Sequence, residues 1–303
     1  MLNVKIGKIG FDNPIMVASG TYGYGNEVMG IANVNGLGGI VTKSVTLNPR
    51  EGNPPPRIHE TSSGMLNSIG LANVGVDSYI KDKLPYLNEL NTKIIINIAG
   101  SSIDEYITVL EKLEESEGRH VGYEINISCP NVKKGGMEFG VDPQMTEKLT
   151  AEIRSMTQKL VIMKLSPNVT SIVDIAKAAE IGGADAVSAI NTVVGSGIDI
   201  KSRKPVIHTT FGGLSGPAIK PIAIANVLKV SRSVIIPVIG IGGISCTNDV
   251  IEFIMAGAAM VQLGTINYTH PNLGESIINE LTAWLHHANL NHIVDVIGVA
   301  EDF

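Results

Sequence analysis

One stretch decides the fold of this chain: Tyr123-Glu124-Ile125-Asn126-Ile127-Ser128-Cys129-Pro130-Asn131. It begins with β-branched and aromatic residues and has no strand breaker before Pro130, which predicts a β-strand. It ends in polar groups, and in α/β folds the carboxyl ends of the strands form the edge where ligands bind. The loop that follows, through residues 133–136, has a composition suited to a lid. We therefore predict that Cys129 is a catalytic acid/base on that lid and that Asn126 holds a substrate beneath it.

The composition bounds the possible functions. The 303 residues suffice for one large barrel or two ordinary domains, and 44% of them are apolar. The net charge is −6, with basic and acidic residues mixed along the chain, so nucleic acid is not expected as a partner. Apolar runs are short, none approaches the ~18 residues of a membrane span, and the N-terminus lacks the pattern of a signal peptide. We therefore expect a cytoplasmic protein with no membrane partner.

The two cysteines, Cys129 and Cys246, bound the redox chemistry. Two are too few for a disulfide framework and too few for an iron–sulfur cluster, which usually takes four thiolates. Any such cluster belongs to another subunit. The histidines show no ligand spacing at a strand end, so no metal site is expected.

Short apolar runs alternate with helical segments along most of the chain. We expect strands at residues 14–18, 40–43, 93–98, 124–127, 161–165, 186–190, 237–240 and 260–263. Helices are expected at residues 26–31, 103–115, 143–156, 172–181, 219–230, 248–255 and 273–288. About eight strand–helix units with continuously apolar strands predict a (β/α)8 barrel. The alternative is an open doubly wound sheet, but no boundary divides the chain, so a single domain over residues 1–303 is expected.

Three segments lie outside the repeating units. Residues 4–6 and 8–11 predict a small N-terminal hairpin. Residues 45–78 and 191–216 are too long for ordinary barrel loops. Because both follow barrel strands, we expect both to cover the catalytic face.

Two glycine turns lie one strand–helix unit apart near the C-terminus: Gly240-Ile241-Gly242-Gly243 and Gly264-Thr265. In barrels the loops after the seventh and eighth strands often bind phosphate through backbone N–H groups. The alternative, tight barrel turns without a ligand, is equally compatible with these residues alone. A dinucleotide-binding reading is weak, because the motif does not open a βαβ unit and lacks the later acidic residue.

Lysines and asparagines gather at predicted strand ends. Lys43 and Lys164 close two apolar strands, where a cation can stabilise negative charge on a bound ring; the alternative is a surface lysine. Amide side chains recur at strand ends and in loops, and an amide offers both a donor and an acceptor to a heterocycle. These amides are Asn67, Asn97, Asn126, Asn131 and Asn191. Each alone is more often a turn residue.

The two thiols are interpreted differently. A thiol acts as a base when its pKa is brought toward neutral, and the polar loop around Cys129 favours that role. Most free cysteines are inert small hydrophobic side chains, and this is our interpretation of Cys246.

Six segments together resemble the class 1B dihydroorotate dehydrogenases over nearly the whole chain. They are residues 13–21, 49–54, 64–71, 126–131, 212–218 and 240–244. The resemblance implies a barrel that binds FMN and oxidises (S)-dihydroorotate to orotate in pyrimidine synthesis. It implies that Cys129 removes the C5 proton while a hydride passes from C6 to the flavin N5.

The resemblance also assigns binding positions. The substrate positions that it implies are Lys43, Asn67, Ser68, Ile69, Gly70, Leu71, Asn126, Asn191 and Thr192. The FMN positions are Ser19, Lys43, Ser44, Asn97, Asn126, Lys164, Ile190, Gly216, Gly242, Gly243, Gly264 and Thr265. Lys164 would then offset charge on the reduced flavin, and the glycine N–H groups would hold its phosphate.

The subclass follows from the residues after Asn131. Residues 132–137 look like class 1B, whose members pair with an electron-transfer subunit carrying FAD and a 2Fe–2S cluster and reduce NAD+. A heterotetramer of two catalytic and two electron-transfer chains is implied. Three alternatives remain: a fumarate-dependent class 1A-like homodimer, a non-flavin phosphate-binding barrel resembling IMP dehydrogenase, and a non-catalytic barrel.

Overall fold

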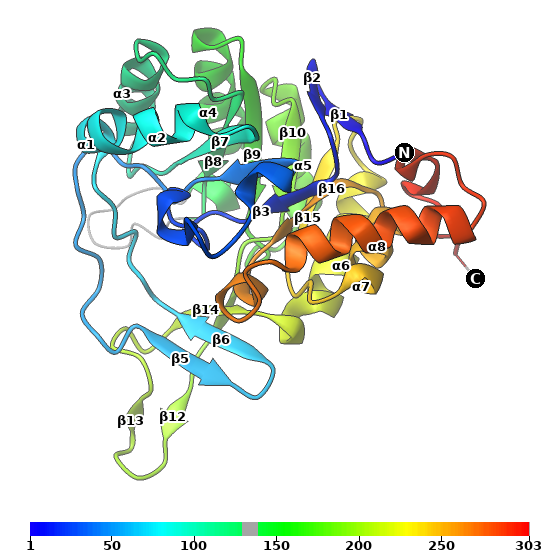
Figure 1. The fold of residues 1–303 in the computed structure, drawn as a ribbon. Helices are drawn as coiled ribbons and strands as arrows, with labels where there is room; N and C mark the ends of the chain where they lie inside the picture. Colours follow the sequence, from blue (N-terminus) through cyan, green and yellow to red (C-terminus); the bar gives the residue numbers. More distant parts are fainter. Residues whose placement is uncertain (129–138, 303) are drawn as a thin grey trace.

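Eight parallel strands close into a barrel in the computed structural model, which describes residues 1–128 and 139–302 (Figure 1). Neighbouring strands follow chain order around the barrel, and the last pairs with the first. The strands are β3 Ile15–Val17, β4 Gly39–Val41, β7 Lys93–Ile98, β8 Gly122–Asn126, β9 Leu160–Leu165, β10 Ala186–Ala189, β15 Val238–Ile241 and β16 Ala258–Leu263. The predicted (β/α)8 barrel is confirmed, and closure excludes the open doubly wound sheet.

Helices surround the barrel. They are α1 Val76–Ser78, the π-helical turn η3 Tyr79–Lys83, α2 Leu84–Glu89, α3 Ile103–Glu114, α4 Pro143–Met156, α5 Ile172–Ile181, α6 Lys220–Ser231, α7 Thr247–Met255 and α8 Leu273–His287. Short 3₁₀ turns lie at η1 Asn26–Val28, η2 Val34–Gly36, η5 Phe139–Val141, η6 Pro217–Ile219, η7 Thr265–Tyr268 and η8 Ile293–Val296. No helix in the described part of the chain is long and apolar enough to cross a membrane.

Two helix predictions need correction. The helix expected at residues 26–31 is only the turn η1, because Gly25 and Gly30 on either side have left-handed φ angles of 89° and 76°. The helical segment from Val76 to Glu89 was not predicted, because it begins inside the stretch assigned to a long loop.

Side-chain caps set the start of three helices. Ser102, Asp142 and Ser171 each accept a hydrogen bond from a backbone N–H in the first turn of α3, α4 and α5. Each such cap contributes about 1 kcal/mol. The local sequence therefore fixes these helix starts independently of packing.

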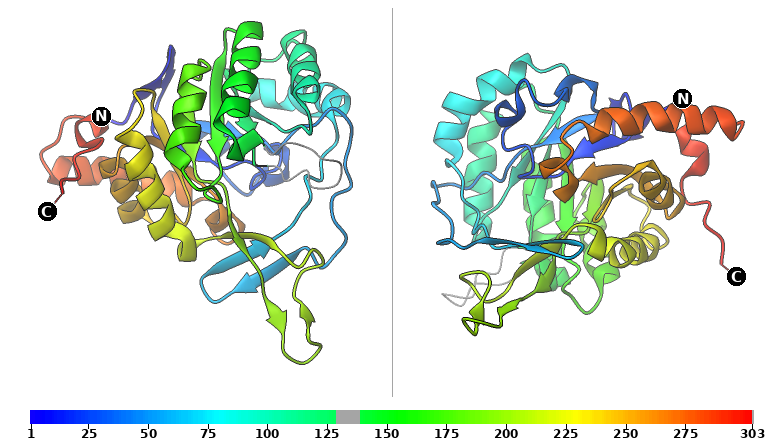
Figure 2. Two further views of the ribbon diagram at one scale, coloured as in Figure 1. Left: turned by 180° about the vertical axis from the view of Figure 1, so that it is seen from behind. Right: turned by 60° about the horizontal axis from the view of Figure 1, so that its bottom comes forward.

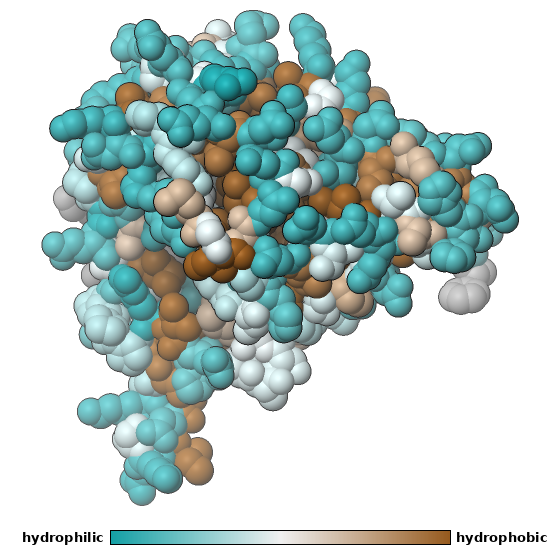
Figure 3. All heavy atoms as spheres, viewed as in Figure 1, coloured by the Kyte–Doolittle hydropathy of each residue, from teal (hydrophilic) through white to brown (hydrophobic). Residues whose placement is uncertain are grey.

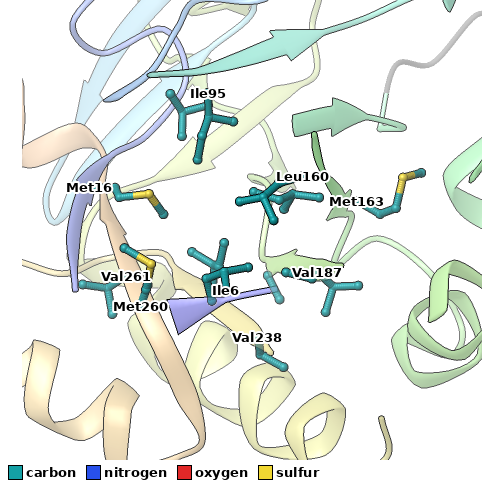
Figure 4. Packing of buried hydrophobic residues seen from close by; sticks show 14 of the residues in the cluster. Ile6, Met16, Ile95, Leu160, Met163, Val187, Val238, Met260 and Val261 are labelled. Carbon is teal, nitrogen blue, oxygen red and sulfur yellow. The ribbon is translucent and has the colours of Figure 1, made fainter. Parts of the chain in front are cut away.

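The N-terminal hairpin closes one end of the barrel. It consists of β1 Val4–Ile6 and β2 Ile9–Phe11, which pair antiparallel as predicted. Ile6 has no exposed surface, and its side chain lies between those of Leu160 and Met260 (Figure 4). The interior at this end is therefore an apolar floor.

The two long segments pair with each other. They form an antiparallel sheet in the order β11-β14-β6-β5, built from β11 Val193–Gly195, β14 Gly212–Ser215, β6 Gly64–Asn67 and β5 Ile58–Thr61. Figure 1 shows this sheet at the end of the barrel opposite the β1–β2 hairpin. Both segments thus border the carboxyl ends of the barrel strands, as expected.

An arm extends beyond this sheet. It carries β12 Ile198–Asp199 and β13 Lys204–Pro205 and projects away from the barrel (Figure 2). Ile198 is 60% exposed and Ile200 is 87% exposed. Hydrophobic residues accordingly colour part of the arm brown in Figure 3.

A hydrogen-bonded group around the buried His120 lies at the start of β8. His120 Nε2 is 2.7 Å from the Tyr123 hydroxyl, which donates to Glu114 Oε1 at 2.6 Å. Lys159 pairs with the same carboxylate at 2.9 Å. Because the Tyr123 hydroxyl donates its proton to Glu114, its oxygen can only accept from His120, so Nε2 of His120 carries a proton and donates it to Tyr123. Its other nitrogen, Nδ1, has no partner among the described residues, so a second proton would be buried without an acceptor.

We predict that protonation of His120 destabilises the fold in acid. Burial, aided by the Lys159 charge, lowers the pKa of His120 from 6.5 to about 4. The folded state therefore binds fewer protons than the unfolded state between these values. The contribution of His120 is complete above about pH 6.5 and is lost as the pH falls toward 4, about 3 kcal/mol in total. Chemical denaturation at a series of pH values measures this loss.

The control for this measurement is His120→Gln, which keeps a donor for Tyr123 and does not titrate. Its free energy of unfolding should depend less on pH in the same window. Equal pH slopes for the two proteins would show that His120 is not the group responsible.

Candidate active site

A buried carboxylate lies inside the barrel, beneath its mouth. Glu124, on β8, has no exposed surface. Its Oε1 accepts from Asn97 Nδ2 at 2.8 Å and from Lys164 Nζ at 3.2 Å. Its Oε2 accepts from Gln262 Nε2 at 2.7 Å and from the Ser188 hydroxyl at 3.0 Å. One side chain thus links β8 to four other strands, β7, β9, β10 and β16.

Glu124 was not among the predicted site residues. A charged residue inside an otherwise apolar strand was the available signal, since carboxylates are almost never fully buried unless paired. A charged residue in an apolar strand does not reveal its hydrogen-bond partners, because the four donors to Glu124 come from other strands.

Lys164 lies within β9 and is 7% exposed, so it is not a surface lysine. Its only ion pair in the described part of the chain is with Glu124. The hydrogen bonds continue on the other side, where the Ser44 hydroxyl donates to Asn97 Oδ1 at 2.6 Å. The structure therefore brings three of the predicted flavin positions, Ser44, Asn97 and Lys164, into one hydrogen-bonded chain.

Two of the predicted amides meet at the ends of β8 and β10. Asn191 Nδ2 donates to Asn126 Oδ1 at 3.2 Å, and Asn191 Oδ1 accepts from the backbone N–H of Thr192 at 2.8 Å. The Tyr106 hydroxyl holds the backbone carbonyl of Asn126 at 2.7 Å. Ile190 is buried, and its N–H donates to the Ile241 carbonyl at 3.0 Å. The predicted residues Asn126, Asn191 and Thr192 are thus in one group.

Lys43 lies two residues beyond the end of β4 and is half-buried. Burial lowers the pKa of its ammonium group below the usual value, and the positive charge of Arg57 lowers it further. Arg57 was not among the predicted site residues, although it follows a proline-rich run in the first long segment. Two cations therefore share this side of the mouth, next to a cavity of about 660 Å³ that Lys43 lines together with Tyr22 and Asn73.

The predicted substrate segment 67–71 follows β6. Asn67 Nδ2 donates to the Gly213 carbonyl of β14 at 3.4 Å, and the Ser68 N–H donates to the Arg57 carbonyl at 2.8 Å. Gly70 and Leu71 have left-handed φ angles of 75° and 57°. Ile69 accepts from the backbone of residue 53 at 3.0 Å. Contacts within the first long segment, and one to the second, thus hold this loop beside β14.

Glycines after β14 and β15 form a close-packed group, here called the glycine cradle. Gly216, Gly242 and Gly243 all have left-handed φ angles, of 95°, 131° and 74°. A Cβ atom on Gly243 would lie 2.8 Å from the Gly216 carbonyl oxygen. The Thr265 hydroxyl donates to the Ser215 hydroxyl at 2.8 Å. Four predicted phosphate positions, Gly216, Gly242, Gly243 and Thr265, are therefore neighbours along three turns.

The remaining predicted positions divide into two groups. Gly264 directly follows β16, and Ser19 lies two residues after the end of β3. The Ala18 N–H donates to the Leu263 carbonyl at 2.8 Å, so both lie at one edge of the mouth. Cys129 and Asn131 lie outside the described residues. Ser128, which precedes them, donates its N–H to Asn126 Oδ1 at 3.3 Å.

Cys246 was interpreted as an inert small hydrophobic side chain, and the structure adds its position. It is exposed and occupies the N-cap position of α7. The preceding turn places it at a helix start, a position that the apolar character of cysteine alone does not reveal.

A sequence profile described as dihydroorotate dehydrogenase matches residues 1–285. The chain belongs to the dihydroorotate dehydrogenase family. The chain is similar to several relatives that carry the name "Dihydroorotate dehydrogenase B (NAD(+)), catalytic subunit". The protein of Thermoanaerobacter sp. (strain X514) is 49% identical over 297 residues, 98% of each chain. That of Trichlorobacter lovleyi is 47% identical over 300 residues, covering 99% of this chain and 98% of the relative. The predicted resemblance to this type is confirmed.

The family consists of flavin-dependent oxidoreductases, and the residues at the mouth fit a flavin. Buried side-chain atoms without a hydrogen-bond partner among the described residues include Ser68 Oγ, Ser128 Oγ and Gln262 Oε1. Unsatisfied buried groups are rare and are expected where a ligand supplies the partner. The glycines of the cradle have no side chains that would keep a phosphate from the backbone, and Lys164 supplies a buried cation. These three features match the phosphate, the polar ring edge and the anionic reduced ring.

We predict that Gly243→Ala destabilises the protein even without flavin. A left-handed φ costs a non-glycine residue about 1–2 kcal/mol, and the new Cβ would also press on the Gly216 carbonyl and the Lys220 backbone. The free energy of unfolding should fall by at least about 1 kcal/mol in urea denaturation. The matched control is Gly10→Ala, at an exposed position of β2 where a Cβ meets no atom within 4 Å. Equal stabilities of the two variants would contradict the close packing of the cradle.

Proposed function

We propose that this protein oxidises (S)-dihydroorotate to orotate in pyrimidine synthesis, with FMN bound at the mouth of the barrel. The observation that carries the proposal is the polar layer across the mouth. In it the chain Ser44–Asn97–Glu124–Lys164 lies beside the Asn126–Asn191 pair, because Asn126 is the register partner of Lys164 across β8 and β9. Family membership and the names of the relatives support it.

The residues divide between cofactor and substrate. Gly216, Gly242, Gly243 and Thr265 would hold the phosphate of FMN, and Lys164 would lie against its ring. When bound, FMN supplies the acceptor for the hydride from C6 of the substrate. The amides of Asn67, Asn126 and Asn191 offer donors and acceptors to the alternating C=O and N–H edge of dihydroorotate. Lys43 offers a positive charge to its carboxylate.

Cys129 is proposed as the base that removes the C5 proton. A thiol serves in this role when part of it is ionised near neutral pH. Asn126 and Ser128, directly before it in the chain, are anchored to each other and to Tyr106. The proton would therefore leave the substrate on the side of the residues that follow β8.

NAD+ is proposed as the final acceptor, reached through a partner subunit that carries FAD and a 2Fe–2S cluster. The printed names of the relatives support NAD+ and the term catalytic subunit. With two cysteines, the chain has too few thiolates for such a cluster. A heterotetramer of two catalytic and two electron-transfer chains in the cytoplasm completes the proposal.

We predict that the purified chain is yellow and that its flavin absorbance bleaches when dihydroorotate is added without oxygen. Bleaching reports flavin reduction by the substrate, and the anaerobic visible spectrum measures it. Reoxidation by NAD+ should require a co-purified, cysteine-rich chain, whereas fumarate should not restore the colour. A chain that stays colourless after FMN is added would refute the proposal. Reoxidation by fumarate without any partner would favour the class 1A-like alternative.

We predict that Cys129→Ser slows flavin reduction by several orders of magnitude at neutral pH. The pKa of a thiol is far lower than that of a hydroxyl, so a much larger fraction of Cys129 is ionised and able to accept the proton. Rapid-mixing absorbance measures the rate. The matched control is Cys246→Ser, which removes the chain's other thiol at an exposed helix start. Its reduction rate should equal that of the unaltered protein. A Cys129→Ser rate equal to the control would show that the base lies elsewhere.

A further inference from the structure

Glu124 is a buried charged residue that has no role in the proposed binding of FMN or substrate, or in the proposed proton removal. Each of its carboxylate oxygens accepts two hydrogen bonds, from Asn97 and Lys164 on one side and from Ser188 and Gln262 on the other. An amide N–H, an ammonium and a hydroxyl are all available as donors, and an ionised carboxylate is an acceptor only. The arrangement therefore fits a carboxylate that carries its charge inside the barrel.

The partner of that charge is Lys164. Nζ lies 3.2 Å from Oε1, and both side chains are buried. The attraction between charges falls with distance and rises in a low-dielectric interior, so each charge largely cancels the field of the other. In the described part of the chain no other ion pair has both side chains so deeply buried. A flavin at the mouth would thus face a cation whose charge is offset by Glu124 rather than a free cation.

We propose that Glu124 is a positioning residue that holds Lys164 in place and offsets its charge, thereby lowering the reduction potential of bound FMN. This inference rests on the proposed function. An uncompensated ammonium beside the ring would stabilise the negative charge of the reduced flavin and raise its potential. The carboxylate limits this stabilisation, so the reduced flavin passes its electrons onward more readily to an acceptor of low potential.

The test compares the affinities of the apoprotein for oxidised and reduced FMN. The ratio of the two dissociation constants reports how far binding shifts the flavin potential, by a thermodynamic cycle. Glu124→Gln keeps the shape of the side chain and removes its charge. It should bind reduced FMN more tightly relative to oxidised FMN, by a factor of at least ten. This factor corresponds to about 30 mV for a two-electron couple.

The matched control is Ser188→Ala, which removes one hydrogen bond to the same carboxylate and leaves the charge. Its ratio should stay near that of the unaltered protein. A ratio for Glu124→Gln equal to the unaltered value overturns the inference. Equal shifts in both variants also overturn it, because they would show that side-chain order rather than charge sets the potential.

A second pair of variants covers the case in which Glu124→Gln does not fold. Lys164→Met is compared with the double variant Glu124→Gln/Lys164→Met, in which the buried pair is neutral. The double variant should show the higher preference for reduced FMN, by at least tenfold, and equal ratios overturn the inference. If the unaltered apoprotein binds no FMN at all, the proposed function fails together with the inference. FMN binding with an unchanged Glu124→Gln ratio refutes the inference alone.

Discussion

The carboxylate of Glu124 is the constraint on which the interior of the barrel near the carboxyl ends of its strands depends. A buried ion without partners costs several kcal/mol, and removing one member of a buried pair typically costs about 3–5 kcal/mol. Here the cost is offset by four donors from four different strands. Those donors are held in place in return, because each points at the same two oxygens. The ring of polar side chains beneath the mouth is therefore fixed by one residue.

This polar layer lies toward the carboxyl ends of the strands, whereas the interior at the end closed by the hairpin is apolar. Stability therefore comes mainly from one end of the barrel and the polar groups for chemistry from the other. The strands are buried on both faces, and the hairpin residue Ile6 fills the closed end. Toward the carboxyl ends the inward positions change to Asn97, Glu124, Lys164, Ser188 and Gln262. Hydrogen bonds within this layer make its side chains rigid before any ligand binds, which reduces the entropy that binding would otherwise cost.

The second sheet contributes what the barrel strands cannot. Strands β6 and β14 come from segments about 150 residues apart, as the pairing of Asn67 with Gly213 illustrates. Their pairing places the loop after Asn67 near the residues that follow β10. The glycine cradle depends on the same kind of contact, since a Cβ on Gly216 would lie 2.7 Å from the Gly64 Cα and a Cβ on Gly64 would lie 2.0 Å from the Ser215 carbonyl oxygen. The predicted substrate and cofactor positions are thus joined through one small antiparallel sheet.

The sequence by itself determined the features that depend on local patterns. Continuous apolar runs predicted the barrel strands, the hairpin followed from residues 4–11, and the six matching segments identified the family. The candidate site at the strand ends was predictable for the same reason, since strand direction fixes which end carries each residue. The predictions of one domain over residues 1–303, and of the role of Cys129, stay predictions.

Only the tertiary structure decided which side chains meet. The partners of Glu124 come from strands separated by up to 138 positions along the chain, and no local period encodes such contacts. The β6–β14 pairing, the exposure of Cys246 and the nearness of Arg57 to Lys43 were missed for the same reason. The helix expected at residues 26–31 failed because backbone angles at two glycines outweighed the propensity of the residues between them. Propensity and periodicity act over a few residues, whereas closure of the barrel brings together groups from its whole length.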